Sequence, residues 1–150
     1  MSDELTGRDL DRAIAEAMGW RVECHGPAVY RLVFKGAYRA TVIAQSEYEA
    51  VDLLWVRAFA LGVVPRYHDD AGAALALVRD VLDKLNAQSI GKGIATSSSW
   101  EFRMTADGVS LTEFGMLFGS DYGGYEVEGR NAEALARLAL KALRGEGGAP

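Results

Sequence analysis

Residues 69–85 read DDAGAALALVRDVLDKL, and residues 100–117 read WEFRMTADGVSLTEFGML. In the first stretch apolar side chains recur every three or four residues, which predicts an amphipathic helix from Asp69 to Leu85. In the second stretch apolar and polar residues alternate on both sides of Asp107-Gly108, a turn signal. This pattern predicts that Trp100–Met104 pairs with Val109–Leu117 as a hairpin. A long helix followed by an antiparallel hairpin is typical of the α+β class.

The same kind of pattern extends toward both ends of the chain. Apolar spacing predicts a helix at Gly7–Met18, and Asn131 is a capping residue for a helix that ends near Leu143. Alternation across residues 29–44 predicts a second hairpin, which turns at Lys35-Gly36-Ala37. The remaining elements are a strand at residues 125–128 and polar loops at residues 88–99 and 119–124.

Residues 46–62 fit two interpretations. Ser46 and Glu49 form a capping-box pattern and Gly62 is a helix stop, which together predict a helix. The segment Leu53–Leu61 is also apolar enough to form a buried strand. We favour a buried helix, and the strand stays open as the alternative.

The element order predicts one layered α+β domain over residues 1–144, with a mainly antiparallel sheet. A chain of 150 residues can bury a core without disulfide or metal staples. Residues 145–150 are rich in glycine and lack apolar anchors, so we expect a flexible C-terminal tail.

Composition excludes several classes of protein. The 21 acidic and 16 basic residues give a net charge of -5, which makes nucleic acid an unlikely partner. The longest apolar stretch, Leu53–Val64, is far shorter than a membrane span, so we expect no membrane partner. An acidic N-terminus unlike a signal peptide and a single cysteine indicate a cytoplasmic location.

No motif indicates a catalytic site, a metal or a cofactor. Cys24 and His25 are adjacent, and adjacent side chains of a strand point to opposite faces, which is poor geometry for a nucleophile and its base. His68, Asp69 and Asp70 are metal-ligand types, yet they stand where a helix start needs capping groups. We therefore favour a protein that is not an enzyme.

Aromatic and basic side chains near helix ends, strands and the 119–124 loop are the weak candidates for ligand binding, because Trp, Tyr and Arg are enriched at binding hot spots. Trp20 and Trp100 also fit an ordinary role in the core. The candidates are Trp20, Arg21, Tyr67, His68, Trp100, Arg103, Tyr122, Tyr125 and Arg130.

Four segments resemble the phage ABA sandwich domain family of small phage and prophage proteins. They are LTGRDLD at 5–11, MGW at 18–20, PRYHDDA at 65–71 and ALARLALKAL at 134–143. The resemblance implies a phage or prophage origin and a three-layer α/β/α sandwich, but no activity. Residues 24–62 depart from the family pattern, being richer in strand and helix than the expected loop.

Two functional hypotheses follow from these observations. The first is a non-enzymatic phage or prophage accessory protein of the bacterial cytoplasm, which acts by binding a host or phage protein or by forming a homodimer. The alternative is a protein that binds or sequesters a small nucleotide-like molecule. Such a protein would stack the base on an aromatic ring and hold the phosphate with Arg or with backbone N–H groups of the 119–124 loop.

Overall fold

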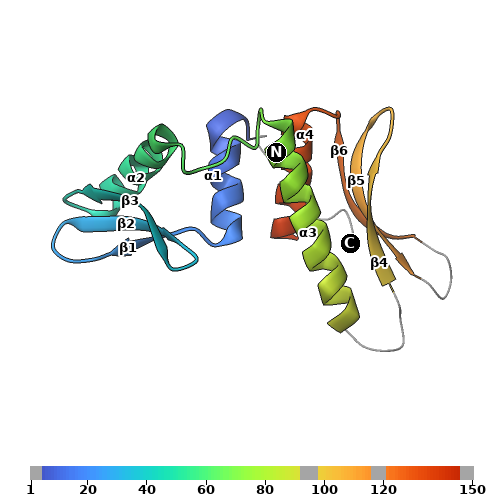
Figure 1. The fold of residues 1–150 in the computed structure, drawn as a ribbon, viewed down its shortest axis with the longest axis horizontal. Helices are drawn as coiled ribbons and strands as arrows, with labels where there is room; N and C mark the ends of the chain where they lie inside the picture. The colour runs from blue at the N-terminus through green and yellow to red at the C-terminus, as the bar shows by residue number, and fades with distance from the viewer. Residues whose placement is uncertain (1–4, 92–97, 116–120, 146–150) are drawn as a thin grey trace. The chain divides into compact units, whose positions relative to one another are not determined.

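The computed structural model describes residues 5–91, 98–115 and 121–145. Within these ranges it has four helices and two three-stranded antiparallel sheets, so the predicted α+β class is confirmed (Figure 1). The elements are α1 (Gly7–Met18), β1 (Arg21–Cys24), β2 (Val29–Phe34), β3 (Ala37–Ile43), α2 (Glu47–Leu61), α3 (Ala71–Gly91), β4 (Ser98–Met104), β5 (Gly108–Gly115), β6 (Asp121–Glu128) and α4 (Ala132–Arg144).

The chain divides into two compact units, each with its own sheet. Unit A is Asp11–Pro65 and holds the sheet β1-β2-β3, while unit B combines Met1–Leu10 with Arg66–Pro150 and holds β4-β5-β6. The sequence predicted one sheet, whereas the structure has two. The prediction could not separate them, because strand periodicity identifies strands without identifying which strands pair. The predictions of one domain over residues 1–144 and of three stacked layers stay predictions.

Unit A is built on a β hairpin that the sequence predicted. Lys35 and Gly36 both have positive φ, 53° and 76°, which matches the tight turns that join antiparallel strands. The short strand β1 was not predicted, and it pairs with β2 so that Val22 lies opposite Leu32 and Glu23 opposite Arg31. The sheet therefore has Val22 and Leu32 on the face that builds the core and Glu23 and Arg31 on the other.

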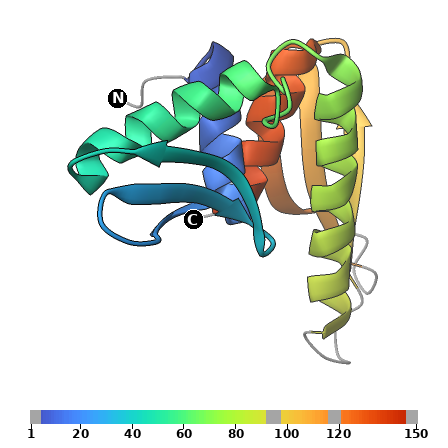
Figure 2. The same ribbon diagram turned by 60° about the vertical axis from the view of Figure 1, so that its left-hand side comes forward.

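The segment with two interpretations is the helix α2. Ser46 accepts a hydrogen bond from the backbone N–H of Glu49, and Gly62 ends the helix in the left-handed conformation with φ 74°. The inner side of α2 is buried with sheet residues such as Leu32 and Ala40 in one core cluster (Figure 2). The buried residues of α2 are Ala50, Leu54, Trp55 and Ala58.

In unit B, α3 and α4 lie side by side and pack on the β4-β5-β6 sheet (Figures 1 and 2). The helix α3 starts at Ala71 because Asp70 caps it by accepting from the N–H of Ala73 at 3.2 Å. It continues to Gly91, beyond the predicted end at Leu85. Asn86 explains this extension, since its side chain bonds the backbone N–H of Trp100 at 2.7 Å and so ties the helix to β4.

The two predicted loops are partly wrong. Residues 88–91 belong to α3 and residues 98–99 to β4, while residues 121–124 belong to β6. The other parts of these loops and residues 146–150 of the predicted 145–150 tail lie outside the described residues. Gly145, the first residue of that predicted tail, is described and ends α4 in the left-handed conformation with φ 69°. The predicted cap of α4 is confirmed, because Asn131 Oδ1 accepts from the N–H of Ala134 at 2.9 Å.

Gly124 in β6 provides a test of the packing in unit B. A Cβ added there would clash with the carbonyl oxygen of Leu111 on the neighbouring strand β5. We expect Gly124→Ala to lower the free energy of unfolding by about 1–3 kcal/mol, since the paired strands must shift apart. Chemical denaturation measures this change. The control is Gly72→Ala in α3, where only the side chain of Asp70 lies near the added atom and stability should be unchanged or slightly raised; equal effects of both variants would contradict the prediction.

Candidate functional site

The candidate residues from the sequence do not form one pocket. Trp20 belongs to the core of unit A, where it is 8% exposed and stacks on Phe34 at 5.1 Å and on Trp55 at 6.0 Å. The guanidinium of Arg39 covers its ring at 5.7 Å. Trp20 is therefore a packing residue, which agrees with the ordinary core role that the sequence also allowed.

Tyr67 and His68 lie just before α3 and are mostly buried. Tyr67 is 9% exposed, and the side chain of His68 lies with its Nε2 3.4 Å from a carboxylate oxygen of Asp69. Arg66 Nε also bonds Asp69 at 3.0 Å, and this hydrogen bond holds the pKa of the Asp69 carboxyl below its ordinary value. This carboxylate therefore serves a local network at the helix start. Among the described residues, no group of three His, Cys, Asp or Glu is placed to hold a metal ion.

On the β4-β5-β6 sheet, the candidates Trp100 and Tyr125 come together. Their rings stack at 5.7 Å on the sheet, and both residues are half-buried. Arg103 pairs with Glu101 at 3.1 Å, and Arg130 is exposed before α4. The side chain of Tyr122 lies outside the described residues. This arrangement gives one aromatic pair and no adjacent candidate arginine.

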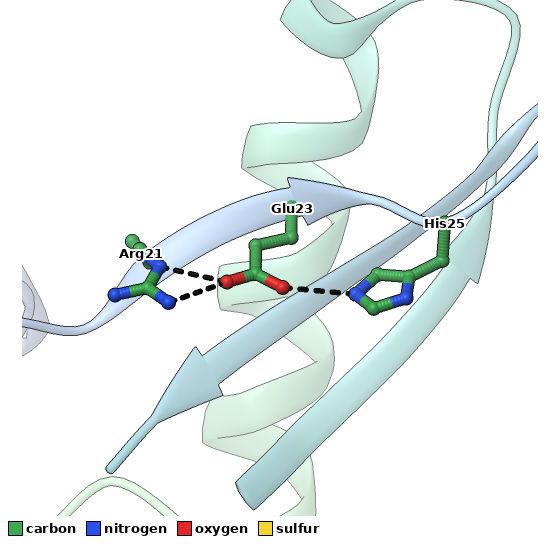
Figure 3. A network of polar contacts seen from close by, with 3 residues as sticks. All are labelled: Arg21, Glu23 and His25. Atoms are coloured by element: carbon green, nitrogen blue, oxygen red, sulfur yellow. Dashed lines mark hydrogen bonds and ion pairs between the residues drawn. The ribbon is translucent and has the colours of Figure 1, made fainter. Parts of the chain in front are cut away.

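The outer face of the β1-β2-β3 sheet carries a polar network that includes the candidate Arg21. Arg21 donates to Glu23 Oε2 from Nε at 2.7 Å, and His25 Nε2 lies 3.0 Å from Glu23 Oε1 (Figure 3). The hydrogen bond from Arg21, followed by that from His25, lowers the pKa of Glu23 below its ordinary value of 4.5. The guanidinium of Arg21 and the imidazole of His25 are thus both directed at one carboxylate.

Tyr38 and Arg31 extend this face, and together with Arg21, Glu23 and His25 we name it the sheet A face. The ring of Tyr38 is 57% exposed and meets the His25 ring edge-on at 5.0 Å. Arg31 lies over the same ring at 4.5 Å, a cation–π contact, and its buried Nε has no hydrogen-bond partner among the described residues. Sequence reasoning found only Arg21, because the other groups are brought together by strand register.

A second surface is the outer side of α2, which we name the α2 outer face. Its apolar members are Val56, 65% exposed, and Leu53, 41% exposed, while Tyr48 at 88% and Leu61 at 58% are exposed in the first and last turns of the helix. The other exposed residues on this side are Glu49, Asp52, Arg57 and Ala60. Beside it a groove opens toward the edge strand β3, where Ile43 is 78% exposed. The residues that line the groove are Val42, Ile43, Leu53, Val56, Arg57 and Ala60.

The sequence predicted that α2 is a buried helix, and this is wrong for its outer side. The sequence already indicated an apolar outer side, because residues 53–61 are apolar except for Arg57. A helix that is apolar on all sides is typical of one that is covered on all sides. No helix in the described part of the chain has the length and apolar character needed to cross a bilayer.

No protein-family model matches this chain, and a search of curated proteins gives no match. The resemblance to the phage ABA sandwich domain family thus stays a prediction that rests on the four segments quoted from the sequence.

The network of Arg21, Glu23 and His25 predicts a pH dependence. Because the pKa of Glu23 is lowered in the folded chain, the network stabilises the fold above pH 4.5 and this contribution is lost as the pH falls through the lowered pKa. Carboxyl NMR titration of Arg21→Gln should move the pKa of Glu23 back toward 4.5. Asp69, which depends on Arg66, is the internal control and should not move. A wild-type Glu23 that titrates at 4.5 or above would contradict the interpretation.

Proposed function

We propose that this chain is a non-enzymatic binding protein and that the α2 outer face is the surface that contacts its protein partner. The observation that carries the proposal is the exposure of Leu53 and Val56 along the outer side of α2, with Tyr48 and Leu61 exposed in its first and last turns. Contiguous exposed apolar side chains with a polar rim mark interaction sites in soluble proteins. Here Glu49, Asp52 and Arg57 supply the polar groups.

The energetics of burial favour occupation of this surface. Complete burial of one large apolar side chain contributes about 1.5–3 kcal/mol. Val56 and Leu61 are more than half exposed, so most of this contribution is left for a partner. The adjoining groove beside Ile43 lets the contact continue from the helix to the edge strand β3. A partner that covers both surfaces would gain from several such side chains at once.

The proposal includes three predictions that were made from the sequence. They are the phage or prophage origin that the four motifs imply, the cytoplasmic location, and the absence of enzymatic activity. What supports a binding role over a catalytic one is that the polar side chains of the candidate sites are engaged with one another, as Arg21 is with Glu23 and Arg66 with Asp69.

A pair of matched variants tests this proposal. Leu53 on α2 and Leu75 on α3 are both 41% exposed, so Leu53→Asp and Leu75→Asp make the same chemical change at the same exposure. We expect both variants to fold with unfolding free energies within about 1 kcal/mol of each other. Tagged wild-type chain should retain bound proteins, untagged copies of itself included, when it is purified from the cells that express it. Leu53→Asp should lose them, while Leu75→Asp should keep them.

Two results would contradict the proposal. If Leu53→Asp unfolds the chain while Leu75→Asp does not, the α2 outer face is a structural face that the folded chain needs. If wild type, Leu53→Asp and Leu75→Asp retain the same material or none, this face does not bind a protein.

A second candidate function is favoured by the sheet A face. The sheet A face holds the bases Arg21 and Arg31 against the single acid Glu23, in a chain of net charge -5. The exposed ring of Tyr38 lies beside Arg31 and His25. An aromatic ring beside the guanidinium of Arg31, whose Nε has no hydrogen-bond partner among the described residues, suits a planar anion such as a nucleotide.

Tyrosine variants separate this candidate from the first. Titration with a nucleoside monophosphate should raise the melting temperature of wild type and of Tyr48→Ala, but not that of Tyr38→Ala, because ligand bound to the native state stabilises it. Tyr48 is the control because it is exposed on α2, away from the sheet A face. The same shift in Tyr38→Ala as in wild type would sink the candidate.

A further inference from the structure

We infer that the partner of the α2 outer face binds through an extended segment, which pairs with the edge strand β3 as a fourth strand and places side chains in the groove beside α2. This inference rests on the proposed function and names the chemistry of the partner. It follows from the backbone groups on the free side of β3, from the residues that line the groove, and from the charge of Arg57.

The backbone of β3 has hydrogen-bonding groups that no other described strand pairs with. In its sheet, β3 neighbours β2 on one side only. The N–H of Ala44 donates to the carbonyl oxygen of Ala28 at 2.9 Å, in the register that sets Ile43 opposite Val29. Because the backbone groups of successive residues point to opposite sides of a strand, those of Thr41 and Ile43 point away from β2. The free side of β3 can therefore accept another strand.

The two edge strands of this sheet differ in how they are protected. The strand β1 has four residues, of which Arg21 and Glu23 are charged. Short edges with charged side chains discourage pairing with another chain. Residues 40–43 of β3 read ATVI, with no charge and no proline, and both Thr41 and Ile43 are exposed. The edge that is open to a partner strand is therefore β3.

The groove supplies side-chain contacts for such a strand. Val42 of β3 and Leu53, Val56 and Ala60 of α2 line it with apolar surface. Alternate side chains of an added strand point to the same face of the sheet as Val42, which packs against the core cluster that α2 completes. These side chains enter the groove and cover Leu53 and Val56. Main-chain hydrogen bonds then provide affinity, and the groove selects apolar residues at every second position.

Arg57 adds a preference for an acidic residue. It is the one charged side chain among the described residues that line the groove, and its guanidinium makes no ion pair or hydrogen bond with the described part of the chain. The acids of the same helix are engaged elsewhere, since Glu49 accepts from the N–H of Gln45 and Asp52 lies 3.5 Å from Arg12. A carboxylate on the bound segment can therefore pair with Arg57.

Proline variants of the two edge strands test the inference with a defined probe. The probe is a displayed library of random peptides, from which those that bind the wild-type chain are selected and synthesised. Thr41→Pro removes an N–H that points away from β2, which edge strands tolerate. Cys24→Pro is the matched control on β1. Cys24 is exposed, and its N–H also points away from β2, because the next residue, His25, donates to Val29 at 2.9 Å.

The expected result is a set of selected peptides with apolar residues at alternate positions and an Asp or Glu. Fluorescence anisotropy should show that Thr41→Pro binds them about tenfold more weakly than wild type, because a main-chain hydrogen bond is lost and the proline ring blocks close approach. Cys24→Pro should bind them within about twofold of wild type, because it alters the opposite edge of the sheet.

Charge reversal decides the question if Thr41→Pro does not fold. Arg57→Glu should weaken binding of an acidic peptide about fivefold, and the same peptide with Lys in place of its acid should recover the loss. The inference is overturned if the library gives no binding peptide, or if the selected peptides bind a folded Thr41→Pro or Arg57→Glu as they bind wild type. If either happens while Leu53→Asp still loses a retained protein, the strand-pairing inference fails and the proposed function stands.

Discussion

The outer side of α2 exposes apolar side chains among its charged ones, because the core of unit A covers only the inner side of the helix. The inner side of the helix completes a small core with Leu32 and Ala40 of the sheet and with Trp20, which stacks on Trp55. A three-stranded sheet cannot cover a helix on both sides, so Leu53 and Val56 stay exposed. The apolar character that builds the unit on one side therefore creates a surface for association on the other.

Local signals were enough to predict the helices and hairpins. The caps Ser46, Gly62 and Asn131 act within a few residues of themselves, so the sequence alone specifies where α2 and α4 begin or end. The features that depend on tertiary contacts could not be predicted. The length of α3 depends on the bond of Asn86 to Trp100, and the division into two sheets depends on which strands meet.

The same distinction between local signals and tertiary contacts explains which parts of the candidate sites could be predicted from the sequence. Trp20, Tyr67 and Trp100 were chosen because their residue types are common at binding sites, but those types also fill cores, and only burial separates the two roles. The sheet A face was found in part, because Arg21 was a candidate while His25 and Tyr38 join it only through strand register. The α2 outer face could have been found in part from the sequence, because residues 53–61 are apolar except for Arg57 and so leave apolar side chains on more than one side of the helix.

Hydrogen–deuterium exchange of the chain alone and of the chain with the protein that it retains tests most directly whether the α2 outer face is a binding surface. The account predicts slower exchange of the backbone amides of α2 in the complex, because a bound partner reduces local opening of this helix, and unchanged exchange in α3. Unchanged exchange throughout α2, with slower exchange confined to other elements, would contradict it.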